Sequence, residues 1–378
     1  FSPYRHGGYS TYFDGTGDYL TGPSSATIGI GTGDFTIECW FYATDGTSID
    51  RGIWETRTDG YPNNSDGLSL TRITETTFRV YGTSQLIVSS ATTITNSWHH
   101  LAVVRNSGTL EFFVNGVSQG TVSNSTNMNS AQPIAIGSGR YTNSNSTPTN
   151  AVKGYIQDFR VLTSAIYTSN FTPPTAPLTA ITNTKFLLGD LPYFKDQSAS
   201  NHAITFDGNV SLEPKSVYDN APYSEADHGA SVHFGEANGN AIIIPTTAAT
   251  TTGDYTIEFW IRYNTNKSGQ QTLSAVDGDH RIVYNAGRFI DWRSGGTQTY
   301  WQNADGTLYQ SERPGIWTHF AQTRTSGVVK AWINGVGSAN TVTDTTSWAT
   351  SRFGSEHNSS SENFEGDMAD IRITHSAI

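Results

Sequence analysis

The sequence predicts an all-β protein built as two tandem β-sandwiches. Three observations support this fold class: apolar and polar residues alternate with a period of two, turn-forming residues recur at short spacing, and the chain repeats one series of motifs. β-Branched and aromatic residues favour pleated strands, whereas Gly, Asn and Asp supply the turns. No window of helical periodicity with capping residues stands out. Many short strands at regular spacing are typical of two packed antiparallel sheets.

Several motifs occur twice in the same order, which identifies two copies of one domain. Gly-Asp-Phe-Thr-Ile-Glu-Cys-Trp at Gly33–Trp40 returns as Gly-Asp-Tyr-Thr-Ile-Glu-Phe-Trp at Gly253–Trp260. Ordered matches with small drift in spacing indicate duplicated domains whose loops differ in length. Shared positions are therefore expected to be scaffold, and unshared loops are where a function of one copy would lie. The other pairs are Ser97–Ala102 with Ile316–Ala321, Asn115–Val117 with Asn334–Val336, and Gly154–Arg160 with Gly366–Arg372.

Individual strands follow from local patterns. In 35–41 the apolar residues at odd positions share one face, so Glu38 and its counterpart Glu258 are expected on the opposite, solvent-facing side. Segments 101–105 and 110–114 read as a hairpin. Asn115-Gly116 follows at once and is a strong two-residue turn toward a further strand, which Asn334-Gly335 repeats.

The domain boundary is predicted in the proline-rich segment 171–177, because prolines break strand pairing and stiffen a linker. This gives domains 1–178 and 179–378, with 185–208 interpreted as the opening strands of the second domain. Copy one would then have its first strands upstream of Phe1. Copy two stops at the equivalent of Ile166, so its tail is cut short and we expect the natural polypeptide to run on in both directions.

The composition excludes several partners and chemistries. A net charge of −11 without a basic stripe argues against nucleic-acid binding, which needs clustered positive charge. No apolar run approaches the ~20 residues that span a bilayer, so no membrane insertion is expected. The single cysteine, Cys39, excludes a disulfide framework and a cysteine-based zinc site, and it is expected to be a small buried residue.

The order of the motifs resembles the laminin-G-like branch of the concanavalin A-like lectin/glucanase superfamily. The resemblance covers nearly all of both copies and implies two tandem jelly-roll sandwiches. A second resemblance, carried by 165–174 and 185–188, is to tandem lectin-like domains in virion and tail-fibre proteins of marine bacteriophages, and it implies a virion setting. The first resemblance rests on the copy-one motifs Tyr12–Leu20, Gly33–Trp40, Trp98–Ala102, Leu110–Gly116 and Gly154–Val161.

The carboxylate pattern of the enzymes in this superfamily is not found, so no catalytic residue is assigned. Those enzymes carry Glu-x-Asp-x-x-Glu on one strand, with nucleophile and acid about 5–5.5 Å apart. The nearest match is Glu365–Asp370, which ends in Asp and holds a turn glycine, and its counterpart 153–158 lacks the first two acids. We therefore expect a non-enzymatic protein, with a glycosidase as a disfavoured alternative.

No cofactor is expected to be required, although structural calcium is a candidate. The resemblance implies an ion held by carboxylates and carbonyls at a sandwich edge. Arg160 and Arg372 recur beside the last two candidates, so an internal ion contact is the alternative reading of those positions. The candidate ligands are Asp14, Asp18, Asp158 and Asp370.

A sugar site would need an exposed aromatic ring to stack on a pyranose, with Asp, Asn or Arg to bind hydroxyl groups. Two unshared loops offer such residues, although loop aromatics are as often packing or subunit contacts. The candidates in copy one are Trp54, Arg57, Asp59, Tyr61, Asn64 and Asp66, and those in copy two are Asp277, Asp279, Trp292, Tyr300 and Trp301.

The sequence thus predicts a non-enzymatic virion surface or tail-fibre protein with lectin-like domains, which adheres to host-surface glycans and contacts other virion proteins or copies of itself. Such a protein would lie on a virion or be otherwise extracellular. Two alternatives stay open at this point: a purely structural capsid-decoration or fibre protein, and a bacterial cell-surface adhesin.

Overall fold

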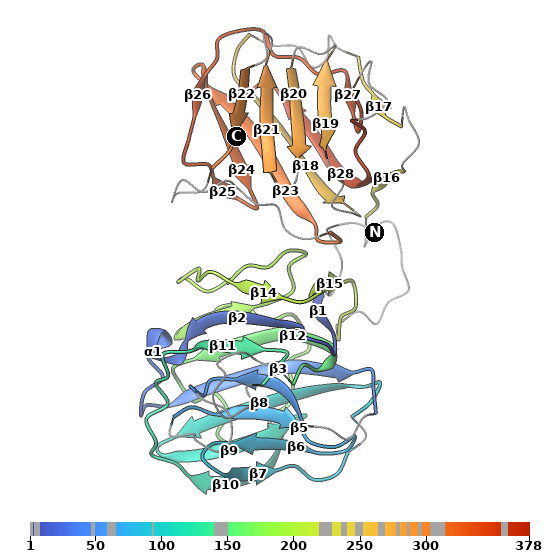
Figure 1. Cartoon of the computed structure of the whole chain (residues 1–378). Helices are drawn as coiled ribbons and strands as arrows, with labels where there is room; N and C mark the ends of the chain where they lie inside the picture. Colours follow the sequence, from blue (N-terminus) through green and yellow to red (C-terminus); the bar gives the residue numbers. More distant parts are fainter. Residues whose placement is uncertain are drawn as a thin grey trace. The chain divides into compact units, whose positions relative to one another are not determined.

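The chain folds into two compact units (Figure 1). The N-terminal unit comprises Arg5–Pro222, and the C-terminal unit comprises Phe1–Tyr4 with Tyr223–Ile378. The structure, a computed structural model, describes residue 3 and the ranges 8–46, 50–58, 66–92, 94–139, 150–218, 229–235, 240–245, 252–263, 269–276, 280–285, 288–293, 297–302, 314–356 and 362–378.

One sheet of the N-terminal unit contains its longest strands. In the described ranges its order is β10-β9-β8-β3-β12-β1-β15, with β13 pairing β12 as well, and every pair is antiparallel. The strands are β10 (Val117–Ser123), β9 (Thr109–Val114), β8 (Trp98–Asn106), β3 (Phe35–Ala43), β12 (Lys153–Leu162), β1 (Ser10–Asp14), β15 (Ser211–Glu213) and β13 (Thr184–Leu188).

The second sheet of this unit has shorter strands in the order β14-β2-β11-β4-β5-β6-β7. A single helical turn, α1 (Ser25–Ile28), follows β2; Ser24 caps its start and Gly29 ends it in the left-handed region. The strands are β14 (Thr205–Asp207), β2 (Tyr19–Ser24), β11 (Pro133–Ile136), β4 (Arg51–Glu55), β5 (Ser69–Arg72), β6 (Phe78–Tyr81) and β7 (Gln85–Val88).

The two sheets pack face to face around an apolar core. The rings of Phe41 on β3 and Phe78 on β6 meet across the layers with centroids 6.1 Å apart. Cys39 is fully buried here, as the sequence predicts for a small apolar residue. Alternation then fixes the other face of β6: with Phe78 and Val80 buried, Arg79 and Tyr81 point away from the core.

The C-terminal unit repeats the two-layer arrangement. Its sheets have the orders β16-β28-β18-β23-β24-β25, with β26 beside β24, and β17-β27-β19-β20-β21-β22. Figure 1 shows β22, β21, β20 and β19 side by side in front, with β23, β18 and β28 behind them. The strands of the first sheet are β16 (Val232–Phe234), β28 (Gly366–Thr374), β18 (Tyr255–Tyr263), β23 (Thr318–Thr325), β24 (Val328–Ile333), β25 (Val336–Gly337) and β26 (Val342–Thr343). Those of the second are β17 (Ile242–Ile243), β27 (Arg352–Phe353), β19 (Gln270–Val276), β20 (His280–Asn285), β21 (Arg288–Arg293) and β22 (Thr297–Tyr300).

Aromatic residues from both layers fill the core of the C-terminal unit. Phe259 on β18 contacts Phe353 on β27 with ring centroids 6.0 Å apart, and Phe320 on β23 stacks on Phe289 of β21 at 4.8 Å. Trp301 is fully buried in the same cluster. The predicted fold class, two tandem all-β sandwiches, is therefore confirmed.

The repeated motifs occupy equivalent positions, including one β-bulge. On β12 the residues Asp158 and Phe159 stand opposite a single residue of β3, and on β28 the same irregularity falls at Asp370 and Ile371 opposite β18. Both aspartates have positive φ, 56° and 48°, a conformation that Asp tolerates better than most residues. A bulge re-aims the side chain that it carries, which explains why this aspartate recurs.

The predicted tight turns are confirmed. β9 ends at Val114 and β10 begins at Val117, so Asn115 and Gly116 alone form the turn, with φ of 50° and 76°. Positive φ at both positions is the type I′ hairpin geometry. In the C-terminal unit Asn334 and Gly335 have φ of 49° and 77°.

The predicted domain boundary differs from the division that the structure shows. Segment 185–208 was expected to open the second domain, but β13 pairs β12, β14 pairs β2 and β15 pairs β1. These strands belong to the N-terminal unit, whose range ends at Pro222 rather than at residue 178. The prolines at 173–177 interrupt strand pairing as expected, but the chain after them returns to the same sandwich.

The prediction that Glu38 faces solvent is also wrong. Thr36, Glu38 and Trp40 alternate with the core residues of β3, yet all three are buried. A second layer of chain therefore covers the outer face of this sheet, and its composition bears on the functional site.

Candidate functional site

Half of the predicted sugar-binding residues cannot be placed. Asp59, Tyr61, Asn64, Asp277 and Asp279 lie outside the described residues, and so does the side chain of Trp292. Of the two loops proposed from the sequence, the structure therefore describes only the residues at each base.

Two predicted stacking residues are unsuitable for that role. Trp54 and Trp301 are both 0 % exposed, so neither ring can lie against a sugar that approaches from solvent. Trp54 sits on β4 opposite Leu70 of β5, facing the sandwich core, and Trp301 belongs to the aromatic core of the C-terminal unit. Burial of a large apolar ring outweighs exposure wherever the strand register points it inward. Tyr300, by contrast, is 38 % exposed, and its hydroxyl donates to Gln298 at 2.9 Å.

Arg57 and Asp66 organise the base of the first loop. The Arg57 guanidinium binds the carboxylate of Glu55 through two N–H groups, with Nη2 to Oε2 at 2.8 Å. Asp66 accepts the Thr58 backbone N–H at 3.1 Å and the Thr58 hydroxyl, which closes the two ends of the loop onto each other. Both residues are therefore held in place by neighbours in their own loop.

A row of polar and aromatic side chains crosses the outer face of the second sheet next to this loop. Glu55 pairs with Ser69, which pairs with Tyr81, so three neighbouring strands contribute to one row. The guanidinium carbons of Arg57 and Arg79 lie 5.2 and 5.1 Å from the centre of the Tyr81 ring, within the range of cation–π attraction. We call Glu55, Arg57, Arg79 and Tyr81 the arginine–tyrosine face.

The outer part of the arginine–tyrosine face is reachable from solvent. Arg79 donates from Nη2 to Asp50 Oδ2 at 2.7 Å, and the side chains of this pair are 18 % and 23 % exposed. Tyr81 is half-buried, whereas Glu55 and Arg57 are buried beneath. Together with Asp50, the face thus offers one phenol, one guanidinium and one carboxylate above the buried Glu55–Arg57 ion pair.

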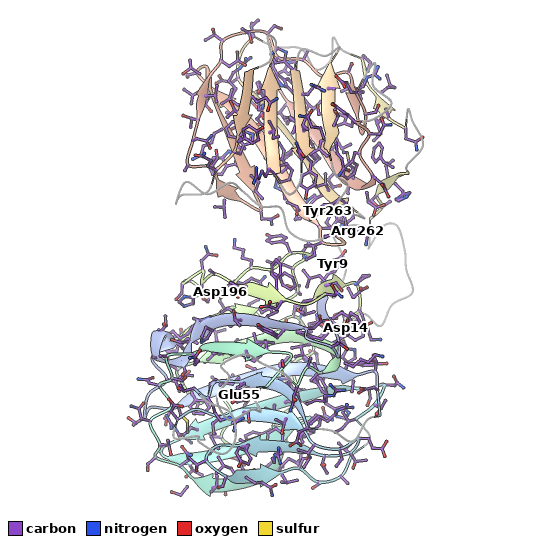
Figure 2. All side chains as sticks on the ribbon, in the orientation of Figure 1. Tyr9, Asp14, Glu55, Asp196, Arg262 and Tyr263 are labelled. Carbon is purple, nitrogen blue, oxygen red and sulfur yellow. The ribbon has the colours of Figure 1, made fainter. Side chains whose placement is uncertain are left out.

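The predicted calcium ligands do not form one site. Asp18 accepts the backbone N–H of Asp14 at 2.7 Å and that of Asn209, and burial raises its pKa. Asp14 stands opposite Lys153 in the β1–β12 pair, so Asp158 lies five residues along the strand, on the order of 16 Å away. Among the described residues, no three side chains of His, Cys, Asp or Glu lie close enough together to hold a metal ion. Figure 2 shows Asp14 well apart from Glu55 in the same unit.

The carboxylates weighed as catalytic are held in other contacts. Asp367, the middle acid of the Glu365–Asp370 match, accepts bonds from Arg262 at 2.7 Å and His233 at 2.9 Å. Glu38 and Glu258 are both bound to an arginine. An ion-paired carboxylate is a poor nucleophile or proton donor, because its charged form is stabilised.

Glu38 belongs to a cluster that recurs in both units. In the N-terminal unit Glu38, Trp40, His100, Asp158 and Arg160 form what we call the first cluster. Arg160 donates to Glu38 Oε1 from Nε at 2.9 Å and from Nη2 at 2.6 Å, and His100 Nε2 lies 3.1 Å from Oε2. Burial raises the pKa of Glu38, but His100 and Arg160 outweigh it, so the net shift is downward.

The chain itself covers the first cluster. Residues Ser164–Leu178, here called the strap, cross the outer face of β3, β8 and β9 after β12 ends. The Tyr167 hydroxyl donates to Glu38 Oε2 at 2.8 Å, and its ring stacks on Phe171 with centroids 3.6 Å apart. Phe171 in turn packs edge-on against His100 and Phe113.

A second tyrosine completes the cover over Asp158. The Tyr218 hydroxyl donates to Asp158 Oδ2 at 2.6 Å and accepts from Trp40 Nε1 at 3.0 Å. The backbone N–H of Leu178, the last residue of the strap, also donates to Asp158. Burial nevertheless dominates and raises the pKa of Asp158 to about 7. One tyrosine hydroxyl thus donates to each of the two carboxylates of the first cluster.

The second cluster, Glu258, Trp260, His319, Asp370 and Arg372, has the same internal contacts but is open. Arg372 binds Glu258, and His319 Nε2 lies 3.4 Å from Glu258 Oε2. Trp260 and His319 have ring centroids 5.0 Å apart, close to the 5.1 Å of Trp40 and His100. The five side chains and Ile371 line a pocket of about 540 Å³.

The two clusters differ in how far their side chains are exposed to solvent. The side chains of Glu38 and Arg160 are 0 % and 6 % exposed, whereas those of Glu258 and Arg372 are 16 % and 58 % exposed. Burial lowers the pKa of His319, which Glu258 only partly offsets. The repeated motifs predicted scaffold at these shared positions in both copies, and they do not distinguish the open cluster from the covered one.

One family model matches this chain in two segments. The model of the concanavalin A-like lectin/glucanases superfamily, of laminin-G type, matches residues 14–169 and 236–378. A search of curated protein sequences finds no significant match. In the described ranges, no helix has the length and apolar character needed to cross a membrane.

Several solved structures are similar in fold at low sequence identity. Domains LG4-5 of the mouse laminin alpha1 chain share 12 % identity, with 99 % of this chain and 90 % of that chain covered and a TM-score of 0.36. A putative carbohydrate binding protein from Bacteroides ovatus shares 13 %, over 55 % of this chain and 60 % of that chain, with a TM-score of 0.39. Since the family model spans most of the sequence in two segments that follow the duplicated motifs, the chain belongs to the concanavalin A-like lectin/glucanases superfamily.

Proposed function

We propose that the protein is a non-catalytic, lectin-like binding protein that holds a glycan on the arginine–tyrosine face of its N-terminal unit. One observation carries the proposal: Tyr81 lies between two guanidinium groups, one of them in an accessible ion pair with Asp50. Membership of a superfamily that includes lectins supports the same function.

The chemistry of this face suits a saccharide. A guanidinium and a carboxylate side by side can donate to and accept from neighbouring hydroxyl groups of one pyranose. Tyr81 adds an apolar ring edge and a hydroxyl. The buried Glu55–Arg57 pair holds the Tyr81 ring through the Arg57 guanidinium, and Asp50 holds Arg79, so little conformational entropy is lost on binding.

The pocket of the second cluster is less suited to this function. Its counterpart in the N-terminal unit is filled by protein, with stacked aromatic rings as well as hydroxyl groups. Such a surface is complementary to a polypeptide segment rather than to a wholly polar ligand.

Adhesion without catalysis is the corresponding proposal for activity. Glu38, Glu258 and Asp367 are engaged with arginines, which supports binding over hydrolysis. We further propose an extracellular setting on a virion surface or tail fibre, for which the resemblance of 165–174 and 185–188 is the support, with other virion proteins or further copies as partners. Structural calcium, with Asp14, Asp18, Asp158 and Asp370 as the candidate ligands, stays a prediction.

A glycan array with the full chain, followed by calorimetry on each hit, tests the function. Arg79→Ala is expected to weaken binding about tenfold or more, because it removes charge-assisted hydrogen bonds. Tyr81→Ala is expected to act in the same direction. Arg288→Ala removes an exposed arginine from β21 of the other unit and serves as the matched control.

Three results would count against the proposal. No glycan binding by the folded chain would remove the function itself. Binding that Arg79→Ala and Tyr81→Ala leave intact would place the site elsewhere. Release of reducing sugar from a bound glycan, lost in Glu38→Gln or Glu258→Gln, would make the protein a glycosidase.

A further inference from the structure

The open pocket of the second cluster has a filled counterpart within the same chain. The first cluster shows what this set of side chains binds when its site is occupied: a strap with a tyrosine and a phenylalanine four residues apart, followed by prolines. The two clusters share strands, register and bulge, so the occupant of one is a direct guide to the occupant of the other.

We propose that the second cluster is a docking site for a polypeptide segment with the chemistry of the strap, that is, Tyr-x-x-x-Phe followed by Pro-Pro. The site extends from the pocket over the outer face of β18, β23 and β24. It is separate from the arginine–tyrosine face, which belongs to the other unit.

The carboxylate that accepts the strap's tyrosine hydroxyl in the first cluster has an equivalent in the second. Tyr167 donates its hydroxyl to the Glu38 oxygen that also faces His100. Glu258 presents the equivalent oxygen to His319, with its other oxygen held by Arg372, and it is partly exposed. A tyrosine hydroxyl can therefore reach the same carboxylate oxygen without displacing the arginine.

The aromatic surface on which Phe171 packs also has an equivalent in the second cluster. Phe171 packs on His100 and on Phe113, which together with Ala102 and Val104 forms a small apolar cluster under the strap. The strand register replaces Phe113 by Trp332, which likewise stands opposite the shared alanine, here Ala321. Trp332 is half-buried, and its indole N–H donates to Thr323. The Lys330 ammonium lies over this ring, 4.7 Å from its centre. A phenylalanine would pack on the ring after the flexible lysine side chain moves aside.

The two units differ in the space above the Asn-Gly turn. A Cβ on Gly116 would lie 1.9 Å from the carbonyl oxygen of Phe171, because the strap crosses directly over this glycine and its oxygen accepts the Phe171 N–H at 2.9 Å. Around Gly335 no atom of the residues that the structure describes lies within 4 Å of the corresponding position. The crossing point of the strap is therefore clear in the C-terminal unit.

A threonine on the central strand anchors the chain at the start of the strap, and both units contain this anchor. Thr36 donates its hydroxyl to Ser164 and accepts the backbone N–H of Ile166. Thr256 makes the same two bonds with Ser376 and Ile378. Ser376–Ile378 thus take the place of Ser164–Ile166 in the anchor, and the proposed docking segment corresponds to Tyr167 onward.

A synthetic peptide with the sequence of Tyr167–Leu178, acetylated at its N-terminus, tests the proposal with the full chain. Titration is followed by tryptophan fluorescence, since the peptide has no tryptophan and Trp260 and Trp332 lie in the site. Saturable binding with one peptide per chain is expected. A peptide with Phe in place of its tyrosine is expected to bind about tenfold more weakly, because the bond to a charged carboxylate is lost.

Variants of the protein locate the site. Glu258→Gln and His319→Ala are expected to weaken peptide binding about tenfold, whereas Arg288→Ala, on the opposite sheet, leaves it unchanged. Circular dichroism confirms that each variant is folded. A scrambled peptide that binds as tightly, or a folded wild-type chain that shows no saturable change at millimolar peptide, would overturn the proposal. Saccharide binding that Glu258→Gln abolishes would overturn it as well, because the pocket would then take sugars.

Discussion

The N-terminal and C-terminal units carry the same five side chains on the same strands, yet one cluster is sealed and the other is open. In the N-terminal unit the strap and Tyr218 cover Glu38 and Asp158 completely. In the C-terminal unit the corresponding Glu258 and Arg372 line a pocket of about 540 Å³. The difference arises from what lies over the sheet, since the strands, their register and the β-bulge are shared.

Among the described residues the repeated motif is thus buried in one copy and lines a pocket in the other. A charged group inside the first cluster needs its partners, because an uncompensated buried charge is costly. The same group in the second cluster is partly hydrated and can exchange partners at little cost. The function of the shared residues therefore depends on the cover rather than on their identity.

The largest expected effect is a difference in folding stability between the Glu38→Gln and Glu258→Gln variants. Glu38→Gln should destabilise the protein by about 3–5 kcal/mol, because it leaves Arg160 buried without its counter-charge. Glu258→Gln should cost less than about 1 kcal/mol, since that pair is partly exposed. Urea unfolding of both variants measures the difference. Equal losses would mean that the two clusters are equally closed.

The pH dependence of stability should sharpen the comparison at the bulge. Burial raises the pKa of Asp158 to about 7, against about 3.9 in the unfolded chain. The stability that the neutral carboxyl contributes is complete below about pH 4 and is lost as the pH rises through 7, on the order of 2–4 kcal/mol. Glu38, whose pKa is lowered, loses its contribution only below about pH 4.

Asp158→Asn removes this titration and keeps a residue that accepts positive φ. Thermal unfolding between pH 4.5 and pH 8 (a range set by the two pKa values of about 3.9 and about 7) should be flatter for this variant than for the wild-type chain. Asp370→Asn, at the exposed counterpart, is the matched control. If Asp158→Asn kept the wild-type slope, the buried carboxyl would not be the group that titrates.

The smallest effect compares the two turn glycines. Both have positive φ, so Gly335→Ala should cost about 1–2 kcal/mol. Gly116→Ala should cost a further 1–3 kcal/mol, roughly, because its Cβ would meet the strap carbonyl. Differential scanning calorimetry of both variants measures this. A larger loss for Gly335→Ala would show that the space above that turn is not open.

Much of the fold followed from local patterns. The β8–β9 hairpin and the turns at Asn115-Gly116 and Asn334-Gly335 were predictable, because period-two alternation and the Asn-Gly pair reflect interactions between residues close in sequence. The destination of β13, β14 and β15 was not, since pairing with β12, β2 and β1 joins residues far apart in the chain.

The candidate sites were only partly predictable. Arg57 was chosen because it lies in an unshared loop, and it does belong to the arginine–tyrosine face, where it contacts Tyr81. Tyr81 and Arg79 were missed, because only strand pairing brings them beside that loop. Trp54 and Trp301 were chosen for their chemistry, but the register turned both rings into the core.

The sequence by itself determined that this chain is all-β, duplicated and built on shared strand motifs, because alternation and turn chemistry act over a few residues. Only the tertiary structure decided that the chain after 178 returns to the first sandwich and that the strap seals one cluster while its counterpart stays open. The physical reason is that burial, and with it the cost of a charge and the reach of a ligand, depends on which distant segments pack over a residue.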